Sequence, residues 1–129
     1  MLPEDGIELS ELTGLSVQAM KDLIFDKVKA RYASQMEKLS DPERQLEFQR
    51  AVILRVVDNN WSEHIDALDQ MRQSVGLRGY AQNNPIVEYQ EESYKMYNNM
   101  IGAIEFEVTR LMMKAQIQPQ TAIRQEAQE

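Results

Sequence analysis

Few side chains in this chain could do acid-base, nucleophilic or metal chemistry. Among its 129 residues there is a single histidine, His64, and there is no cysteine. These counts exclude two-histidine and cysteine-based zinc motifs, a disulfide framework and a thiolate nucleophile. His64 falls one turn after Trp61 on an apolar stripe, and no nucleophile at a turn accompanies it. We therefore interpret His64 as a packed, hydrogen-bonded side chain and Trp61 as a structural anchor.

Carboxylates are plentiful, but their spacing is typical of a solvated helix surface. The segment EYQEES carries Glu88, Glu91 and Glu92 on a polar helical face, where an acid-base pair is the less favoured interpretation. Neither G-x-x-x-x-G-K-[ST] nor G-x-G-x-x-G occurs, so no phosphate-binding loop is encoded. We predict no catalytic residue, no metal site and no cofactor site in the chain itself.

Composition limits the class of protein and of partner. A hydrophobic content of 43% supports a core and suits one domain or a piece of a larger one. A net charge of −7 and a pI near 4.8 argue against a nucleic-acid binder, which needs clustered Lys and Arg. No apolar run reaches the length of a membrane span, and no signal-peptide pattern opens the chain. We expect a soluble protein, or one peripheral to a membrane.

The elements that must position these side chains are helices. Ser16 is a candidate N-cap for an amphipathic helix that runs to about Leu39. Pro42, with Asp41 as cap, starts a second pattern that runs without a breaker to about Arg78, roughly 54 Å at 1.5 Å per residue. Its apolar seam is Leu46, Arg50, Ile53, Val57, Trp61, His64, Leu68, Met71 and Val75.

A third helix follows a short connection. Gly79 suits a left-handed C-cap, and Asn84 with Pro85 restarts a helix that ends near QIQP. A short connection makes two long helices antiparallel neighbours, so the fold class is all-α, a long helical hairpin with an additional N-terminal amphipathic helix. The seam of this last helix is Ile86, Tyr89, Ser93, Tyr97, Met100, Ile104, Val108, Leu111 and Ala115.

Both seams are flanked by further apolar residues, such as Ile65 on one helix and Ile101 on the other. A stripe wider than a two-helix contact indicates that something else packs there. The sequence leaves open whether this is a second copy of the chain or a partner helix.

The connection LRGYAQNNP carries one large side chain, Tyr80. Turn chemistry leaves open whether Tyr80 packs inward or is held out for a partner. Between Asp69 and Glu88 there is no acidic residue. Arg72 and Arg78 lie in this interval, so the tip has a formal charge of +2, which helix C-termini alone would favour. A basic tip with a tyrosine, on a lever about 50 Å long, nevertheless suggests a contact point.

The stretch from Val56 to Ile117 resembles the C-terminal part of SecA, the bacterial motor ATPase of protein export. The resemblance rests on the run W-x-x-H-x-x-x-(L/M)-D-x-(L/M)-R-x-x-(I/V)-x-L-R-(G/A)-Y-A-Q-x-(N/D)-P. Here the matching residues are Trp61, His64, Leu68, Asp69, Met71, Arg72, Val75, Leu77, Arg78, Gly79, Tyr80, Ala81, Gln82, Asn84 and Pro85.

The resemblance implies a domain organisation and a set of site residues. Residues 1–40 are expected to be the end of the helical wing domain, 41–118 the helical scaffold segment with a two-helix finger, and 119–129 a flexible tail. In the family the finger lies at the cytoplasmic mouth of the SecY channel, and its loop tyrosine contacts the translocating polypeptide. The expected polypeptide-contacting tip is Tyr80, Gly79, Arg78, Ala81 and Gln82. The expected structural anchors are Trp61, His64, Leu68 and Met71.

The resemblance also implies parts that this chain lacks: both nucleotide-binding domains, the preprotein cross-linking domain, the long scaffold helix and the Cys-rich zinc tail. ATP and Mg would be bound by the parent protein, and the chain alone should be inactive as an ATPase. The missing scaffold helix would account for the wide apolar stripe.

Expected partners are SecYEG, unfolded preprotein, other SecA domains and an anionic membrane surface that suits the basic tip. A homodimer is possible and nucleic acid is not expected. The expected location is cytoplasmic and peripheral at the cytoplasmic face of the plasma membrane. The alternative hypothesis is a stand-alone helical dimerisation or scaffold module without a role in transport.

Overall fold

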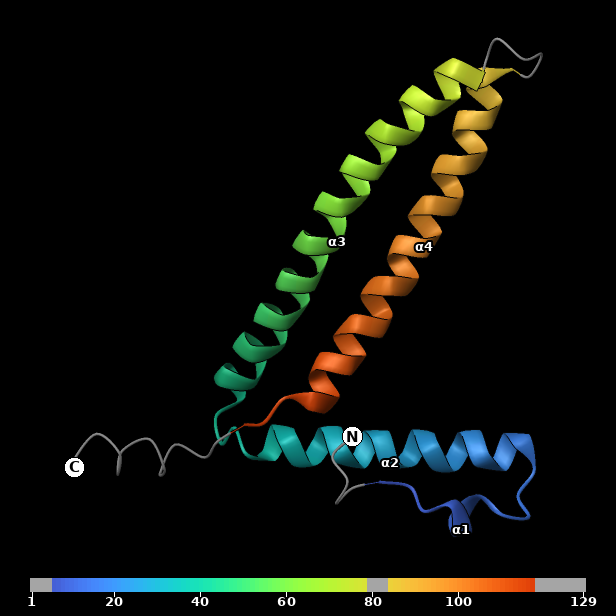
Figure 1. The fold of residues 1–129 in the computed structure, drawn as a ribbon. Helices are drawn as coiled ribbons and strands as arrows, with labels where there is room; N and C mark the ends of the chain where they lie inside the picture. Colours follow the sequence, from blue (N-terminus) through green and yellow to red (C-terminus); the bar gives the residue numbers. More distant parts are fainter. Residues whose placement is uncertain (1–5, 79–83, 118–129) are drawn as a thin grey trace. The chain divides into compact units, whose positions relative to one another are not determined.

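The computed structural model describes residues 6–78 and 84–117, and the part of the chain that it describes is helical with no strand. Within these described ranges the helices are, in order (Figure 1), α1 Leu9–Leu12, α2 Val17–Glu37, α3 Pro42–Arg78 and α4 Pro85–Lys114. The predicted all-α class with long helices is confirmed. The fold forms two compact units, residues 1–50 with 110–129, and residues 51–109. The domain boundaries expected at residues 40 and 118 stay predictions.

The helix starts are those that the capping residues predicted. Ser16 Oγ accepts a hydrogen bond from the Ala19 amide at 3.2 Å and so satisfies one free donor of the first turn of α2. Asp41 and Asn84 do the same for α3 and α4, since their side-chain oxygens accept from the amide two residues later at 3.0 and 3.1 Å. The predicted C-cap Gly79 and the predicted tail 119–129 lie outside the described residues.

The short helix α1 was not anticipated. It is joined to α2 by an ion pair between Glu11 and Lys27. Gly14, in the turn that follows α1, has φ of 83°, a left-handed conformation that glycine adopts at low cost. Four residues of helix bounded by such a turn give too little periodicity to be recognised in a sequence.

Within the first unit, glutamine amides hold the turn from α2 to α3. Gln45 Nε2 donates to the carbonyl oxygens of Met36 and Leu39, both at 2.8 Å, at the C-terminal end of α2. The Met36 carbonyl also accepts from the Leu39 amide at 3.0 Å, so the glutamine adds a second bond there. The buried Gln35 donates from Nε2 to the Met113 carbonyl oxygen at 3.2 Å. Hydrogen bonds from uncharged side chains therefore stabilise this part of the first unit.

Within the second unit, α3 and α4 run antiparallel and side by side as a hairpin (Figure 1). Asn60 of α3 contacts Glu107 near the end of α4, and Arg78 at the end of α3 contacts Glu88 near the start of α4. The described α3 residues buried in this hairpin are Val56, Asn60, His64, Met71 and Val75. The predicted antiparallel hairpin is confirmed.

The predicted seam of α3 is right in its second half and wrong in its first half. His64, Met71 and Val75 are buried as predicted, but Val56 and Asn60 are buried in place of Val57 and Trp61. One residue turns a helix face by about 100°. Because apolar residues cover a stripe wider than one contact, α4 packs on one edge of it and leaves the other edge in solvent.

The seam of α4 shows the same shift. Met100 is buried as predicted and Ile104 is half-buried, whereas Ile86, Tyr97 and Leu111 remain exposed. A regular apolar stripe therefore predicts which side of a helix can be buried. The position of the packing partner decides which residues on that side are buried.

Candidate functional site

Of the expected polypeptide-contacting tip, the structure describes one residue, Arg78. Gly79, Tyr80, Ala81 and Gln82 lie outside the described residues, so their expected roles stay predictions. Arg78, the fifth member, is the last residue of α3 and is half-exposed.

Arg78 joins the two helices of the hairpin through a pair of glutamates on α4. Its Nη1 donates to Glu88 Oε1 and to Glu92 Oε1, each at 3.0 Å, and its Nη2 donates to Glu92 Oε2 at 3.3 Å. The two bonds to Glu92 make a bidentate pair, the arrangement that the planar guanidinium favours with a carboxylate. The hydrogen bond that Arg78 donates to Glu92, with the negative charge of both glutamates, raises the pKa of Arg78 above its ordinary value.

The expectation of a basic tip is wrong for these arginines. Arg72 is paired with Asp69 on its own helix at 3.4 Å, and the charge of Arg78 is outweighed by its two carboxylates. The formal charge of +2 belongs to the residues between Asp69 and Glu88, and the neutralising carboxylates lie at and beyond the two ends of this interval. The hairpin brings those glutamates back to Arg78.

Among the expected structural anchors, His64 and Met71 are each 8% exposed. The His64 ring lies between Trp61, with ring centroids 5.7 Å apart, and Tyr97 of α4, with centroids 6.3 Å apart in an edge-on arrangement. Aromatic pairs at these separations add to area burial. Leu68 is half-buried, and Trp61 keeps 49% of its surface exposed.

Trp61 belongs to an exposed apolar surface on the hairpin. Leu54, Trp61 and Ile65 share one face of α3 by their spacing of seven and four residues. On α4, Tyr97 lies next to His64, and the exposed Ile101 follows it one turn later. We call these five residues the apolar flank. Its large side chains stay in contact with water in this chain, which is typical of a surface that another element covers.

A buried polar contact between α3 and α4 was not anticipated. Asn60 is 8% exposed, and its Nδ2 donates to the Val56 carbonyl oxygen at 3.0 Å and to Glu107 Oε2 at 3.1 Å. Hydrophobic periodicity cannot detect such a pair, because both residues are polar. The only signal was the position of Asn60 beside the apolar stripe.

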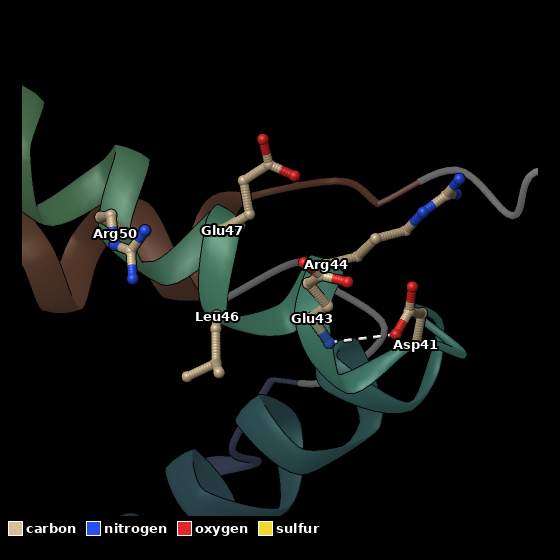
Figure 2. Close-up of a pocket in the computed structure, with 6 residues that line it drawn as sticks. All are labelled: Asp41, Glu43, Arg44, Leu46, Glu47 and Arg50. Atoms are coloured by element: carbon tan, nitrogen blue, oxygen red, sulfur yellow. Dashed lines mark hydrogen bonds between the residues drawn. The ribbon is translucent and has the colours of Figure 1, made fainter.

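Nothing in the described residues has the arrangement of a catalytic or metal centre. In residues 6–78 and 84–117 no three His, Asp or Glu side chains cluster as metal ligands would. A surface pocket lies over the first turns of α3 (Figure 2), where the Asp41 carboxylate is committed to the Glu43 amide. Arg44, Leu46 and Glu47 point away from one another there, so no reacting atom would be held between them.

Comparison with known families decides what kind of chain this is. The family model described as the SecA Wing and Scaffold domain matches residues 4–116. The chain belongs to the SecA family. Its match covers both the α2 unit and the hairpin, so the SecA resemblance carried by the Trp61 to Pro85 run extends over nearly all of the sequence. No solved structure matches the chain significantly.

SecA membership connects the chain with protein transport. Across the described parts of this SecA chain, no helix is long and apolar enough to cross a bilayer. The hairpin of this SecA chain thus has two described features besides its core, the Arg78 pairs at its end and the apolar flank.

Proposed function

We propose that this chain supplies the two-helix finger of the SecA protein translocase. The hairpin of residues 51–109 would carry Tyr80 to the SecY channel and to unfolded preprotein. ATP hydrolysis by domains outside this chain would drive its movement. The observation that carries the proposal is an antiparallel hairpin, in a SecA wing and scaffold chain, whose end is tied across both helices beside the tyrosine-bearing connection.

The hairpin has the mechanical properties that such a finger needs. α3 has 37 residues and α4 has 30, which correspond to about 55 and 45 Å of helix. Buried side chains recur along α3 from Val56 to Val75, so the two helices support each other over most of this length. A paired hairpin of this kind transmits a push with little bending, whereas an isolated helix would not.

Tyrosine suits a contact with many different polypeptides. Its ring offers apolar area and its hydroxyl can hydrogen-bond to any backbone, so neither interaction depends on the sequence that passes. An anionic membrane surface is not part of the proposal, because the arginines that would attract it are paired with carboxylates.

The other domains of SecA provide the natural partner of the apolar flank. The scaffold helix that the SecA resemblance implies beside the finger would cover Trp61, Ile65 and their neighbours. We therefore assign the flank to assembly of the motor and the tip to contact with channel and preprotein. The location that follows is the cytoplasm and the cytoplasmic face of the membrane.

Replacement of Tyr80 by Ala tests the proposal. In full-length SecA carrying this sequence, we expect Tyr80→Ala to reduce preprotein transport into SecYEG proteoliposomes by about thirtyfold, which corresponds to a lost hot spot of about 2 kcal/mol. ATP hydrolysis in the absence of channel should be unchanged, because the nucleotide site lies in other domains.

Phe106→Ala is the matched control. Phe106 is an exposed aromatic of α4 outside both the tip and the apolar flank, so its truncation should leave transport close to the wild-type rate. Normal transport by Tyr80→Ala, or an equal loss in both variants, would contradict the proposed role of the tip.

The alternative, a stand-alone dimerisation module, is favoured by one observation. The apolar flank is exposed in the single chain, and a second copy could cover it. Analytical sedimentation distinguishes the two. A chain that stays monomeric at high concentration and binds SecYEG membranes supports the finger, and a tight dimer that ignores them supports the module.

A further inference from the structure

The end of the hairpin is held by a cluster of three charged residues, Arg78, Glu88 and Glu92, which we call the arginine staple. We propose that Arg78 is a positioning residue that holds the last turn of α3 against the first two turns of α4, rather than a residue that grips the polypeptide. This role concerns the geometry of the tip and rests on the proposed function only for what the tip does.

The staple sits where it can control the connection. Arg78 is the last residue of α3, and Glu88 lies in the first turn of α4 with Glu92 one turn later. The six residues between the helices are therefore bracketed by interhelical bonds rather than by bonds within one helix. The staple therefore holds together the two helix ends that the connection joins.

The local electrostatics favour this arrangement. A cation in the last turn of α3 and an acid in the first turn of α4 each complement the dipole of their own helix. One guanidinium then bridges two carboxylates that are a single turn apart and would otherwise repel each other. The bidentate geometry with Glu92 needs the guanidinium fork, which an ammonium group cannot reproduce.

Glu88 adds a reason for the staple to stay closed. Its Oε1 accepts from Arg78, whereas its Oε2 is enclosed and has no hydrogen-bond partner. An enclosed carboxylate oxygen without a donor is unfavourable, and removing Arg78 would leave the whole group without compensation. The charge of the half-exposed Arg78 is therefore neutralised by Glu88 and Glu92, so its attraction for an incoming polypeptide is weak.

Amide hydrogen exchange in this chain measures the staple directly. We expect Arg78→Gln to accelerate exchange at residues 75–78 and 88–92 by about fivefold relative to the middle of the hairpin. Arg78→Lys should give an intermediate value, because it keeps the charge and loses the fork. The double change Arg78→Glu with Glu92→Arg should recover part of the protection, since it restores an opposite pair across the same two helices but sets a second carboxylate near Glu88.

Arg72→Gln is the matched control, because it removes the same charge from the same helix. Among the described residues Arg72 pairs with Asp69 of its own helix, so this variant should leave exchange at residues 75–78 and 88–92 at the wild-type rate. In addition, 1 M salt should reduce the difference in amide exchange rate between the wild-type chain and Arg78→Gln, because salt screens half-exposed ion pairs. Equal exchange in the Arg78 and Arg72 variants, or no recovery in the charge swap, would overturn the staple.

Transport by full-length SecA separates this inference from the proposed function. A staple that positions Tyr80 predicts that Arg78→Gln lowers transport and that the charge swap restores part of it, which a residue gripping polypeptide would not permit. Loss without rescue overturns the positioning role. If Tyr80→Ala transports normally while the exchange results hold, the finger proposal fails and the staple stands.

Discussion

The buried contact between Asn60 and Glu107 matters because it places polar groups in the seam of the hairpin. An amide donor there satisfies one carboxylate oxygen and one backbone carbonyl at once. Such a contact contributes little net stability, yet it penalises any register that separates the two residues. It therefore helps to fix how far α3 and α4 are offset along their length.

The substitution Asn60→Asp tests the contribution of the Asn60 Nδ2 donor to stability. The substitution puts a second carboxylate beside Glu107 in the seam, and we expect the free energy of unfolding to fall by about 2 kcal/mol in urea denaturation followed by circular dichroism.

Asn59→Asp is the control, because it makes the same chemical change one position away on an exposed residue and should cost less than about 0.5 kcal/mol. Adding Glu107→Gln to Asn60→Asp should recover much of the lost free energy of unfolding, because it removes one of the two carboxylates. Equal costs at positions 59 and 60 would show that the seam contact is unimportant.

What the sequence predicts at this scale depends on the kind of residue. Ser16, Asp41 and Asn84 were assigned as caps correctly, because a cap acts on amides within three residues of itself. Asn60 with Glu107, and Arg78 with its glutamates, were missed because their partners are distant in sequence and meet only after the hairpin closes.

At the scale of single elements, the long helices tolerate some unfavourable residues. Gly102 lies inside α4, and a Cβ added there would meet no atom within 4 Å. Glycine in a helix interior is less favourable than alanine by about 0.5 to 1 kcal/mol, because it loses more backbone freedom on folding.

Gly102→Ala should therefore stabilise the chain by about 0.8 kcal/mol in chemical denaturation. Gly14→Ala is the contrasting variant: there is open space at Gly14 too, but its φ of 83° is strained for alanine. We expect Gly14→Ala to destabilise α1 and the turn after it. Destabilisation by Gly102→Ala would mean that space at this position is needed by something that packs on α4.

The helices were predictable as elements, but the face that each one buries was only half predictable. The starts of α3 and α4 follow from proline and its cap, and their lengths from an unbroken pattern. The buried edge does not follow, because Val56 and Val57 are equally apolar and only the position of α4 decides between them. The short helix α1 was missed since four residues carry no usable period.

For the whole molecule, the apolar flank separates what the chain stabilises by itself from what it leaves for a partner. Ile65→Ser changes a side chain that is still 42% exposed, so it should cost this chain less than about 1 kcal/mol. In full-length SecA the same change should cost clearly more, because the flank would be covered there.

Val75→Ser is the control for this comparison. Val75 is only 3% exposed in the hairpin, so its replacement should cost about 2 kcal/mol or more in both proteins, measured as urea midpoints. An Ile65→Ser cost that is equal in the short chain and in full-length SecA would show that nothing covers the flank.

For the whole molecule, family membership is the property that the sequence predicts best. A long run of matched residues carries that information even where single positions are misjudged, because fold membership is spread over many residues. The basic tip was inferred from a local count of charges, and the hairpin overturned it by bringing distant carboxylates to the arginines.

The position of Trp61 gives the molecule an optical reporter of its own assembly. It is the sole tryptophan, its indole lies on the apolar flank, and half of its surface faces water. Indole emission shifts to shorter wavelength when water is replaced by apolar neighbours. The intrinsic fluorescence of this unlabelled chain thus reads out whether the flank is covered, through a residue far along the helix from the tip.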